Sequence, residues 1–167
     1  MRSRRALLYM PGDEDRKIRK ALTLDVDSIC MDLEDGVAVN RKLQARETVL
    51  QALKSYNFGR SEKLVRINPV SSGLFVDDLQ AVIPGKPDGI VLPKIEYPEH
   101  VRRVGMRIGE LEQAIHALEA HLESLHTDIA TASAAGDTER ISRLGEDYTR
   151  AENELDSLMG EWTLLAD

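Results

Sequence analysis

The chain has 167 residues, of which 42% are hydrophobic, and its formal net charge is −7. No apolar run approaches the roughly 20 residues that a membrane-spanning helix needs. The apolar run near the N-terminus stops at Pro11, which is too short for the core of a secretory signal. The single cysteine excludes a disulfide framework within the chain. We therefore expect a cytoplasmic protein with no membrane association and one or two folded domains.

The composition changes sharply near residue 105. All six prolines lie at or before Pro98, and no lysine follows Lys94. Residues 1–104 carry 18 lysines and arginines against 15 aspartates and glutamates, whereas residues 105–167 carry 4 against 14. Such an asymmetry predicts two modules, 1–104 and 105–167, with different physical character.

The first module alternates between short apolar runs and amphipathic stretches. The predicted elements, in chain order, are a strand at 5–10, a helix at 13–24, a strand at 28–33, a helix at 41–55, a strand at 63–68, a helix at 75–83, a strand at 89–92 and a helix that opens at 93. The helix at 41–55 is expected to turn Leu43, Val49, Leu50 and Leu53 inward.

This β/α alternation predicts a parallel sheet with right-handed crossovers. Two architectures fit it, an open doubly wound sheet and part of a (β/α)₈ barrel. A Gly-x-Gly-x-x-Gly motif does not follow the first strand, so a dinucleotide-binding fold has no support. A complete barrel needs about 250 residues, so the first module has room for about four strands.

A carboxylate cluster follows the most apolar of the predicted strands. Asp32, Glu34 and Asp35 come at the end of the strand at 28–33, directly before Gly36. Enzymes with parallel sheets place their chemistry where strands pass into loops at the carboxyl edge. A solvated acidic loop is an equally good interpretation of this stretch taken alone.

Four motifs in the first module resemble one known family. They are RRALLYMPGDEDRKIRKAL, DSICMDLEDGVAVNRKLQAR, KLVRINPVSSG and DGIVLPKIEYPEHV, and together they cover residues 4–104. In this order and spacing they resemble the citrate lyase beta subunit-like family of the aldolase and citrate lyase superfamily, and within it the citramalyl-CoA and malyl-CoA lyases. The resemblance implies a (β/α)₈ barrel, here a partial one. It also implies an enzyme that makes or breaks a carbon–carbon bond beside a CoA thioester with the help of Mg²⁺.

The resemblance also assigns roles to individual residues. Arg66 matches the arginine that grips the substrate carboxylate, a task for which a planar two-pronged donor is suited. Tyr9, Arg16 and Lys20 match positions that contact the CoA-bearing substrate, although the family often has lysine at the position of Arg16.

The remaining carboxylates match the family less closely. Glu34, Asp35 and Glu96 are expected at the rim of the pocket or in its second layer. The glutamate and aspartate that bind the metal in the family lie on later barrel strands, and this sequence has no match for them. We therefore assign no catalytic residue and no metal ligand, and expect the chain to be incomplete and inactive alone.

The second module has a heptad pattern. The apolar residues recur at alternating spacings of three and four: Ile108, Leu111, Ile115, Leu118, Leu122, Leu125 and Ile129, then Ile141, Leu144, Tyr148, Ala151, Leu155, Leu158, Trp162 and Leu165. This spacing predicts two helices that pair as an antiparallel coiled-coil hairpin. The turn falls at residues 134–137, where Gly136 suits a left-handed conformation and Asp137 or Thr138 can cap the second helix.

This module resembles the coiled-coil C-terminal domain of ABC-F ATPases in its arm ELEQAIHALEAHLESL, its turn GDTERI and its ending AENELDSLMGEW. It differs in charge, because four arginines face fourteen acids, and an acidic rod disfavours nucleic-acid binding.

Three hypotheses for the whole chain remain. The first is an incomplete lyase-family protein that recognises an acyl-CoA thioester and self-associates through open sheet edges. The second is a non-enzymatic interaction module whose working part is the hairpin. The third is a chimeric fusion product with no joint function, because the junction falls inside a predicted barrel helix.

Overall fold

The computed structural model describes residues 4–160 of the chain. The chain divides into two compact units, Met1–Gly109 and Glu110–Asp167. Within residues 4–160, no helix combines the length and the apolar character that a membrane crossing requires.

The first unit has the predicted β/α alternation. Its elements are β1 (Leu7–Pro11), α1 (Asp15–Ala21), β2 (Ser28–Asp32), α2 (Lys42–Ser55), β3 (Glu62–Arg66), α3 (Phe75–Val82), β4 (Gly89–Val91) and the start of α4 (Pro98–Ala135). Short 3₁₀ turns lie at Val39–Arg41, Val70–Ser72 and Ile83–Gly85. The main difference from the expected boundaries is in α4, which begins five residues later than the helix predicted at 93 and runs without a break past residue 105.

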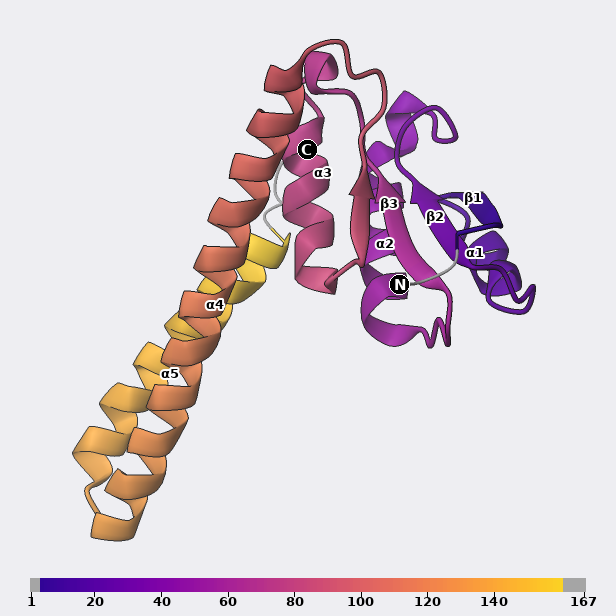
Figure 1. Cartoon of the computed structure of the whole chain (residues 1–167). Helices are drawn as coiled ribbons and strands as arrows, with labels where there is room; N and C mark the ends of the chain where they lie inside the picture. The colour runs from indigo at the N-terminus through magenta and orange to yellow at the C-terminus, as the bar shows by residue number, and fades with distance from the viewer. Residues whose placement is uncertain (1–3, 161–167) are drawn as a thin grey trace. The chain divides into compact units, whose positions relative to one another are not determined.

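The four strands form one parallel sheet in the order β1-β2-β3-β4 (Figure 1). A doubly wound sheet reverses its strand order at a switch point, and these strands follow one another without a reversal. The sheet is therefore compatible with a partial (β/α)₈ barrel. The pairing places Pro11, Asp32, Arg66 and Val91 in one row across its carboxyl edge.

The two faces of the sheet carry different side chains, because side chains alternate along a strand. Ile29 and Met31 of β2 point to one face and are fully buried, and the helices contribute apolar side chains such as Val49 of α2 and Leu79 of α3 to the same core. Cys30 and Asp32 belong to the opposite face, together with the residues paired with them in β1 and β3. The second face therefore carries the polar side chains of the carboxyl edge.

The inner side of α2 differs from the expectation. Leu43 and Leu50 are half-buried, whereas Ala45, Arg46 and Val49 are buried. A charged side chain thus takes a core-facing position that the hydrophobic pattern assigned to leucine.

In the second unit, a turn separates the end of α4 from α5 (Thr138–Gly160), and α5 runs back beside α4 (Figure 1). Gly136 has φ +70°, which favours glycine. The Asp137 carboxylate accepts the main-chain N–H of Arg140 at 3.0 Å, so Asp137, one of the two candidate caps, is the residue that caps α5. An ion pair between Arg140 and Asp128, at 3.3 Å, links the two helices near the turn.

The heptad positions of the second unit are buried to different extents. Leu111, Ile115, Leu125 and Ala151 are buried. The positions Leu118, Leu122, Tyr148 and Leu155 are half-buried. Trp162 and Leu165 lie outside the described residues. The coiled-coil character of the pair therefore remains a prediction.

Candidate functional site

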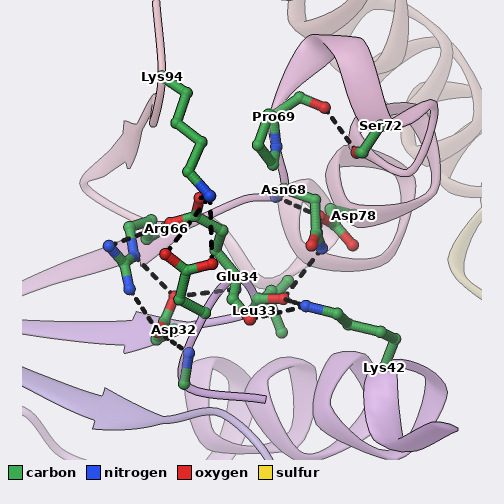
Figure 2. A network of polar contacts seen from close by, with 12 residues as sticks. Asp32, Leu33, Glu34, Lys42, Arg66, Asn68, Pro69, Ser72, Asp78 and Lys94 are labelled. Carbon is green, nitrogen blue, oxygen red and sulfur yellow. Dashed lines mark hydrogen bonds and ion pairs between the residues drawn. The ribbon is translucent and has the colours of Figure 1, made fainter. Parts of the chain in front are cut away.

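The centre of the candidate site is a two-pronged ion pair between neighbouring strands. Asp32 ends β2 and Arg66 ends β3, and the parallel register sets the two residues side by side. Arg66 donates from Nε to Oδ1 of Asp32 at 2.8 Å and from Nη2 to Oδ2 at 2.7 Å (Figure 2). The main-chain N–H groups of Glu34 and Gly36 donate to the same carboxylate, each at 2.8 Å. Asp32 thus accepts four hydrogen bonds, which fix its orientation.

The electrostatics of this pair follow from its surroundings. Burial acts against the charged form of Asp32, but the bonds from Arg66 and from the two main-chain N–H groups outweigh it, so the pKa of Asp32 lies below its ordinary value. The hydrogen bond to Asp32 likewise raises the pKa of Arg66. A Cβ atom at Gly36 would lie 2.5 Å from Oδ2 of Asp32, so only glycine allows the loop to approach this closely.

Glu34 extends the pair into a cluster. Its buried carboxylate lies 3.0 Å from Nη1 of Arg66 through Oε2 and 2.8 Å from Nζ of Lys94 through Oε1. Lys94 follows β4 and also contacts the exposed Asp35, at 3.2 Å. Hydrogen bonds to Glu34 and Asp35 raise the pKa of Lys94. Three carboxylates and two cations from three successive strand ends therefore meet at one edge of the sheet.

Tyr9 of β1 adds an aromatic ring to the cluster. The guanidinium carbon of Arg66 lies 5.0 Å from the centre of the Tyr9 ring, a cation–π arrangement. An arginine side chain carries five N–H groups, and three of those of Arg66 are engaged by Asp32 and Glu34. The other two N–H groups of Arg66 have no partner among the contacts of residues 4–160, so a ligand could accept hydrogen bonds from them. The Arg66 side chain is 24% exposed, so a ligand could reach them from solvent.

Behind the cluster, two side chains hold the main chain that carries Glu34. Lys42 of α2 donates to the carbonyl oxygens of Leu33 and Glu34 at 2.5 and 2.7 Å. Asn68, two residues after β3, donates from its side-chain amide to the same Leu33 oxygen at 2.9 Å. Burial lowers the pKa of Lys42, against the opposing influence of the nearby carboxylates.

The structure brings together four of the seven residues that the sequence nominated for the site. Tyr9, Arg66, Glu34 and Asp35 belong to the cluster described above. The other three are exposed: Arg16 and Lys20 on α1, and Glu96 in the segment after β4. No contact described among residues 4–160 joins these three to the cluster, so their assignment to substrate and pocket rim remains a prediction.

Sequence reasoning included Asp32 in the acidic cluster after the strand at 28–33 but assigned it no role, and it did not nominate Lys94. Asp32 is the last residue of a buried strand, and Lys94 lies three residues after the end of β4. The signal that could have identified both is the register of a parallel sheet, which places successive strand ends in one row.

A magnesium site does not fit the described side chains. Within residues 4–160, no group of three or more His, Cys, Asp and Glu side chains is arranged to hold a metal ion. The carboxylates of Asp32, Glu34 and Asp35 are each paired with Arg66 or Lys94 rather than with one another. The cluster is thus built to hold cationic side chains.

A parallel β/α sheet with a charged cluster at its carboxyl edge is compatible with part of a (β/α)₈ barrel, a fold in which active sites lie at that edge. The family model of HpcH/HpaI aldolase/citrate lyase matches residues 5–148 of this chain. The chain belongs to that family. The matched region continues beyond the first unit, so the resemblance of residues 105–167 to ABC-F ATPases finds no support here and remains a prediction.

Several curated proteins match part of this chain. Human citramalyl-CoA lyase, mitochondrial, is 44% identical over 101 residues, which are 59% of this chain and 30% of that protein. The (3S)-malyl-CoA thioesterase of Cereibacter sphaeroides is 36% identical over 100 residues, or 60% of this chain and 35% of that protein. The citrate lyase subunit beta of Leuconostoc mesenteroides is 33% identical over 112 residues, or 67% of this chain and 37% of that protein. The chain thus spans about a third of the length of these relatives.

Proposed function

We propose that this chain carries the carboxylate-binding part of a carbon–carbon lyase site for 3-hydroxyacyl-CoA thioesters of the citramalyl-CoA or malyl-CoA type. Family membership supports the class of reaction, and the activities for which the relatives are named support the CoA thioester as substrate. The observation that carries the proposal is the state of Arg66, which is oriented by two carboxylates and an aromatic ring while part of its side chain faces solvent.

The geometry of Arg66 suits this role for a physical reason. A free arginine side chain loses rotamer freedom when it binds a ligand, whereas the Arg66 fork is already held by Asp32 and Glu34. A carboxylate that approaches its two remaining N–H groups gains charge-assisted hydrogen bonds at a low ordering cost. Lys94 offsets part of the repulsion from the resident carboxylates, because its ammonium group lies against Glu34 and Asp35.

In the reaction of this substrate class, the bond between the hydroxyl-bearing carbon and the carbon next to the thioester carbonyl breaks. The hydroxyl proton passes to a base, and the bonding electron pair enters an enolate of the thioester, which then takes up a proton. We propose that the chain binds the substrate and does not complete these steps alone. Its clustered carboxylates are neutralised by cationic side chains, and no described group of donors suits the Mg²⁺ expected for the family.

The proposal is tested by calorimetric titration of the full chain with (3S)-malyl-CoA and citramalyl-CoA. Replacement of Arg66 by Lys should weaken binding by roughly 10- to 100-fold, because charge-assisted hydrogen bonds contribute about 1.5–3 kcal/mol. The matched control is Arg60→Lys. Arg60 is an exposed arginine in the loop before β3, and it forms an ion pair with Asp25. Absence of binding by the unaltered chain, or equal binding by both variants, would overturn the proposal that Arg66 binds the substrate carboxylate.

The same samples test the second half of the proposal. We expect no release of acetyl-CoA above background, with or without added Mg²⁺. Release that depends on Mg²⁺ and disappears in Arg66→Lys would contradict the inactivity of the chain while supporting its substrate class.

A further inference from the structure

A buried ion pair links the helices of the first unit to the loop after β3. Asp78 of α3 is 0% exposed, and its Oδ1 accepts a hydrogen bond from Nε of Arg46 in α2 at 2.8 Å. Its other oxygen accepts the main-chain N–H and the side-chain amide of Asn68, both at 2.6 Å. One buried carboxylate therefore connects α2, α3 and the segment that follows β3.

Overall stability does not explain such a pair. Desolvating two charges offsets most of their attraction, and apolar side chains of similar volume often stabilise a core equally well. What the pair contributes is a defined position for each group that it bonds. Asn68 in turn donates to the carbonyl oxygen of Leu33, so the pair also restrains the loop after β2.

The loop after β2 is the place where these contacts converge. Asn68 donates to the carbonyl oxygen of Leu33, and Lys42 donates to the carbonyl oxygens of Leu33 and Glu34 (Figure 2). Two consecutive main-chain carbonyls thus accept three donor contacts from two separate elements. The main chain at residues 33–34 cannot shift without breaking bonds to the half-buried Lys42 and to the buried amide of Asn68.

The position of the main chain at residues 33–34 sets where the Glu34 side chain lies in the cluster. Its carboxylate is buried between Arg66 and Lys94, at 3.0 and 2.8 Å. We propose that Asp78, Asn68 and Lys42 are positioning residues that act through the main chain of residues 33–34 to hold Glu34 against these two cations. None of the three positioning side chains needs to touch a ligand. The consequence for ligand binding rests on the proposed function, whereas the consequence for Arg66 itself does not.

The first test follows Arg66 without any ligand. In the full chain, the Nε–H group of Arg66 donates to Asp32 and should give an NMR cross-peak protected from solvent exchange at neutral pH, assigned by its absence in Arg66→Lys. Asp78→Asn and Lys42→Met should each broaden this cross-peak beyond detection, although neither residue contacts Arg66 in the contacts described here.

The matched control is Asp27→Asn. Asp27 is also buried and ion-paired, to Arg5, but it lies at the opposite end of β2. This variant should lose stability and keep the Arg66 cross-peak. Retention of the peak in folded Asp78→Asn and in folded Lys42→Met would overturn the inference. So would its loss in Asp27→Asn, because general destabilisation would then account for the effect.

The second test adds (3S)-malyl-CoA. Asp78→Asn and Lys42→Met should weaken its binding by roughly 2- to 30-fold, the range that corresponds to couplings of about 0.5–2 kcal/mol along a network. Lys42→Arg keeps a cation for the two carbonyls and should restore affinity. An equal loss in Lys42→Arg and Lys42→Met would refute the positioning role of Lys42. If the unaltered chain does not bind but the cross-peak responds as expected, the positioning network stands and the proposed function fails.

Discussion

Replacement of Asp32 by Asn tests the centre of the cluster. The carboxylate accepts two N–H groups from Arg66 and two from the main chain, at 2.7–2.8 Å. An asparagine retains one acceptor oxygen, and its amide nitrogen would face donors on the other side. The substitution therefore removes about half of the bonds and leaves the charge of Arg66 with Glu34 as its remaining ion-pair partner among the contacts described.

The expected loss of stability follows from these contacts. Breaking a buried ion pair by removing one partner costs about 3–5 kcal/mol. Arg66 is partly exposed and can regain water, which reduces the expected loss to about 2–4 kcal/mol. Asp35→Asn is the matched control, because Asp35 is 68% exposed and a surface substitution usually changes stability by less than about 0.5 kcal/mol.

The single cysteine provides the assay. Cys30 lies in β2, is fully buried, and has a thiol whose pKa burial raises to about 12, so it reacts with a thiol reagent only after the sheet opens. In the full chain, Asp32→Asn should accelerate labelling of Cys30 by roughly 30- to 1,000-fold, the equivalent of about 2–4 kcal/mol. A change similar to that in Asp35→Asn would refute the structural role of the ion pair.

The pH dependence of stability gives an independent check that ionised Asp32 stabilises the folded state. The pKa of Asp32 is lowered in the folded chain, so its ionisation favours the folded state at every pH above the ordinary value of 3.8. This contribution is lost as the pH falls from that value through the folded pKa. The difference between the unaltered chain and Asp32→Asn should therefore be constant near neutral pH and shrink below 3.8.

Three further outcomes are expected. Gly36→Ala would press a Cβ atom against the Asp32 carboxylate and should cost about 1–3 kcal/mol in the same labelling assay, whereas Gly105→Ala, which meets no atom within 4 Å, should not destabilise the chain. In the second unit, Leu125→Ala should cost about 2–5 kcal/mol and the half-buried Leu118→Ala less, as measured by thermal unfolding in far-ultraviolet circular dichroism; equal losses would contradict the burial pattern. Because β1 and β4 each pair with a single neighbour in the described sheet, we expect self-association of the full chain in light scattering, and a stable monomer at all concentrations would exclude it.

The sequence alone determined the elements and the edge at which the site lies. Apolar runs separated by amphipathic stretches predicted the four parallel strands, because alternation of strands and helices implies a parallel sheet. Polar residues at the strand ends, such as Glu34 and Arg66, indicated the carboxyl edge. The turn at Gly136 and the cap at Asp137 were also predictable, because both depend on local backbone geometry.

Only the tertiary structure decided which of these residues meet. Asp32 and Arg66 are 34 positions apart in the sequence, and strand register alone sets them side by side. Arg46 and Asp78 would be assigned to solvent by any hydrophobic pattern, yet each satisfies the other's buried charge. A periodic pattern ranks the faces of one helix or strand at a time, whereas a buried ion pair is favourable only when two elements, each unfavourable alone, are brought together.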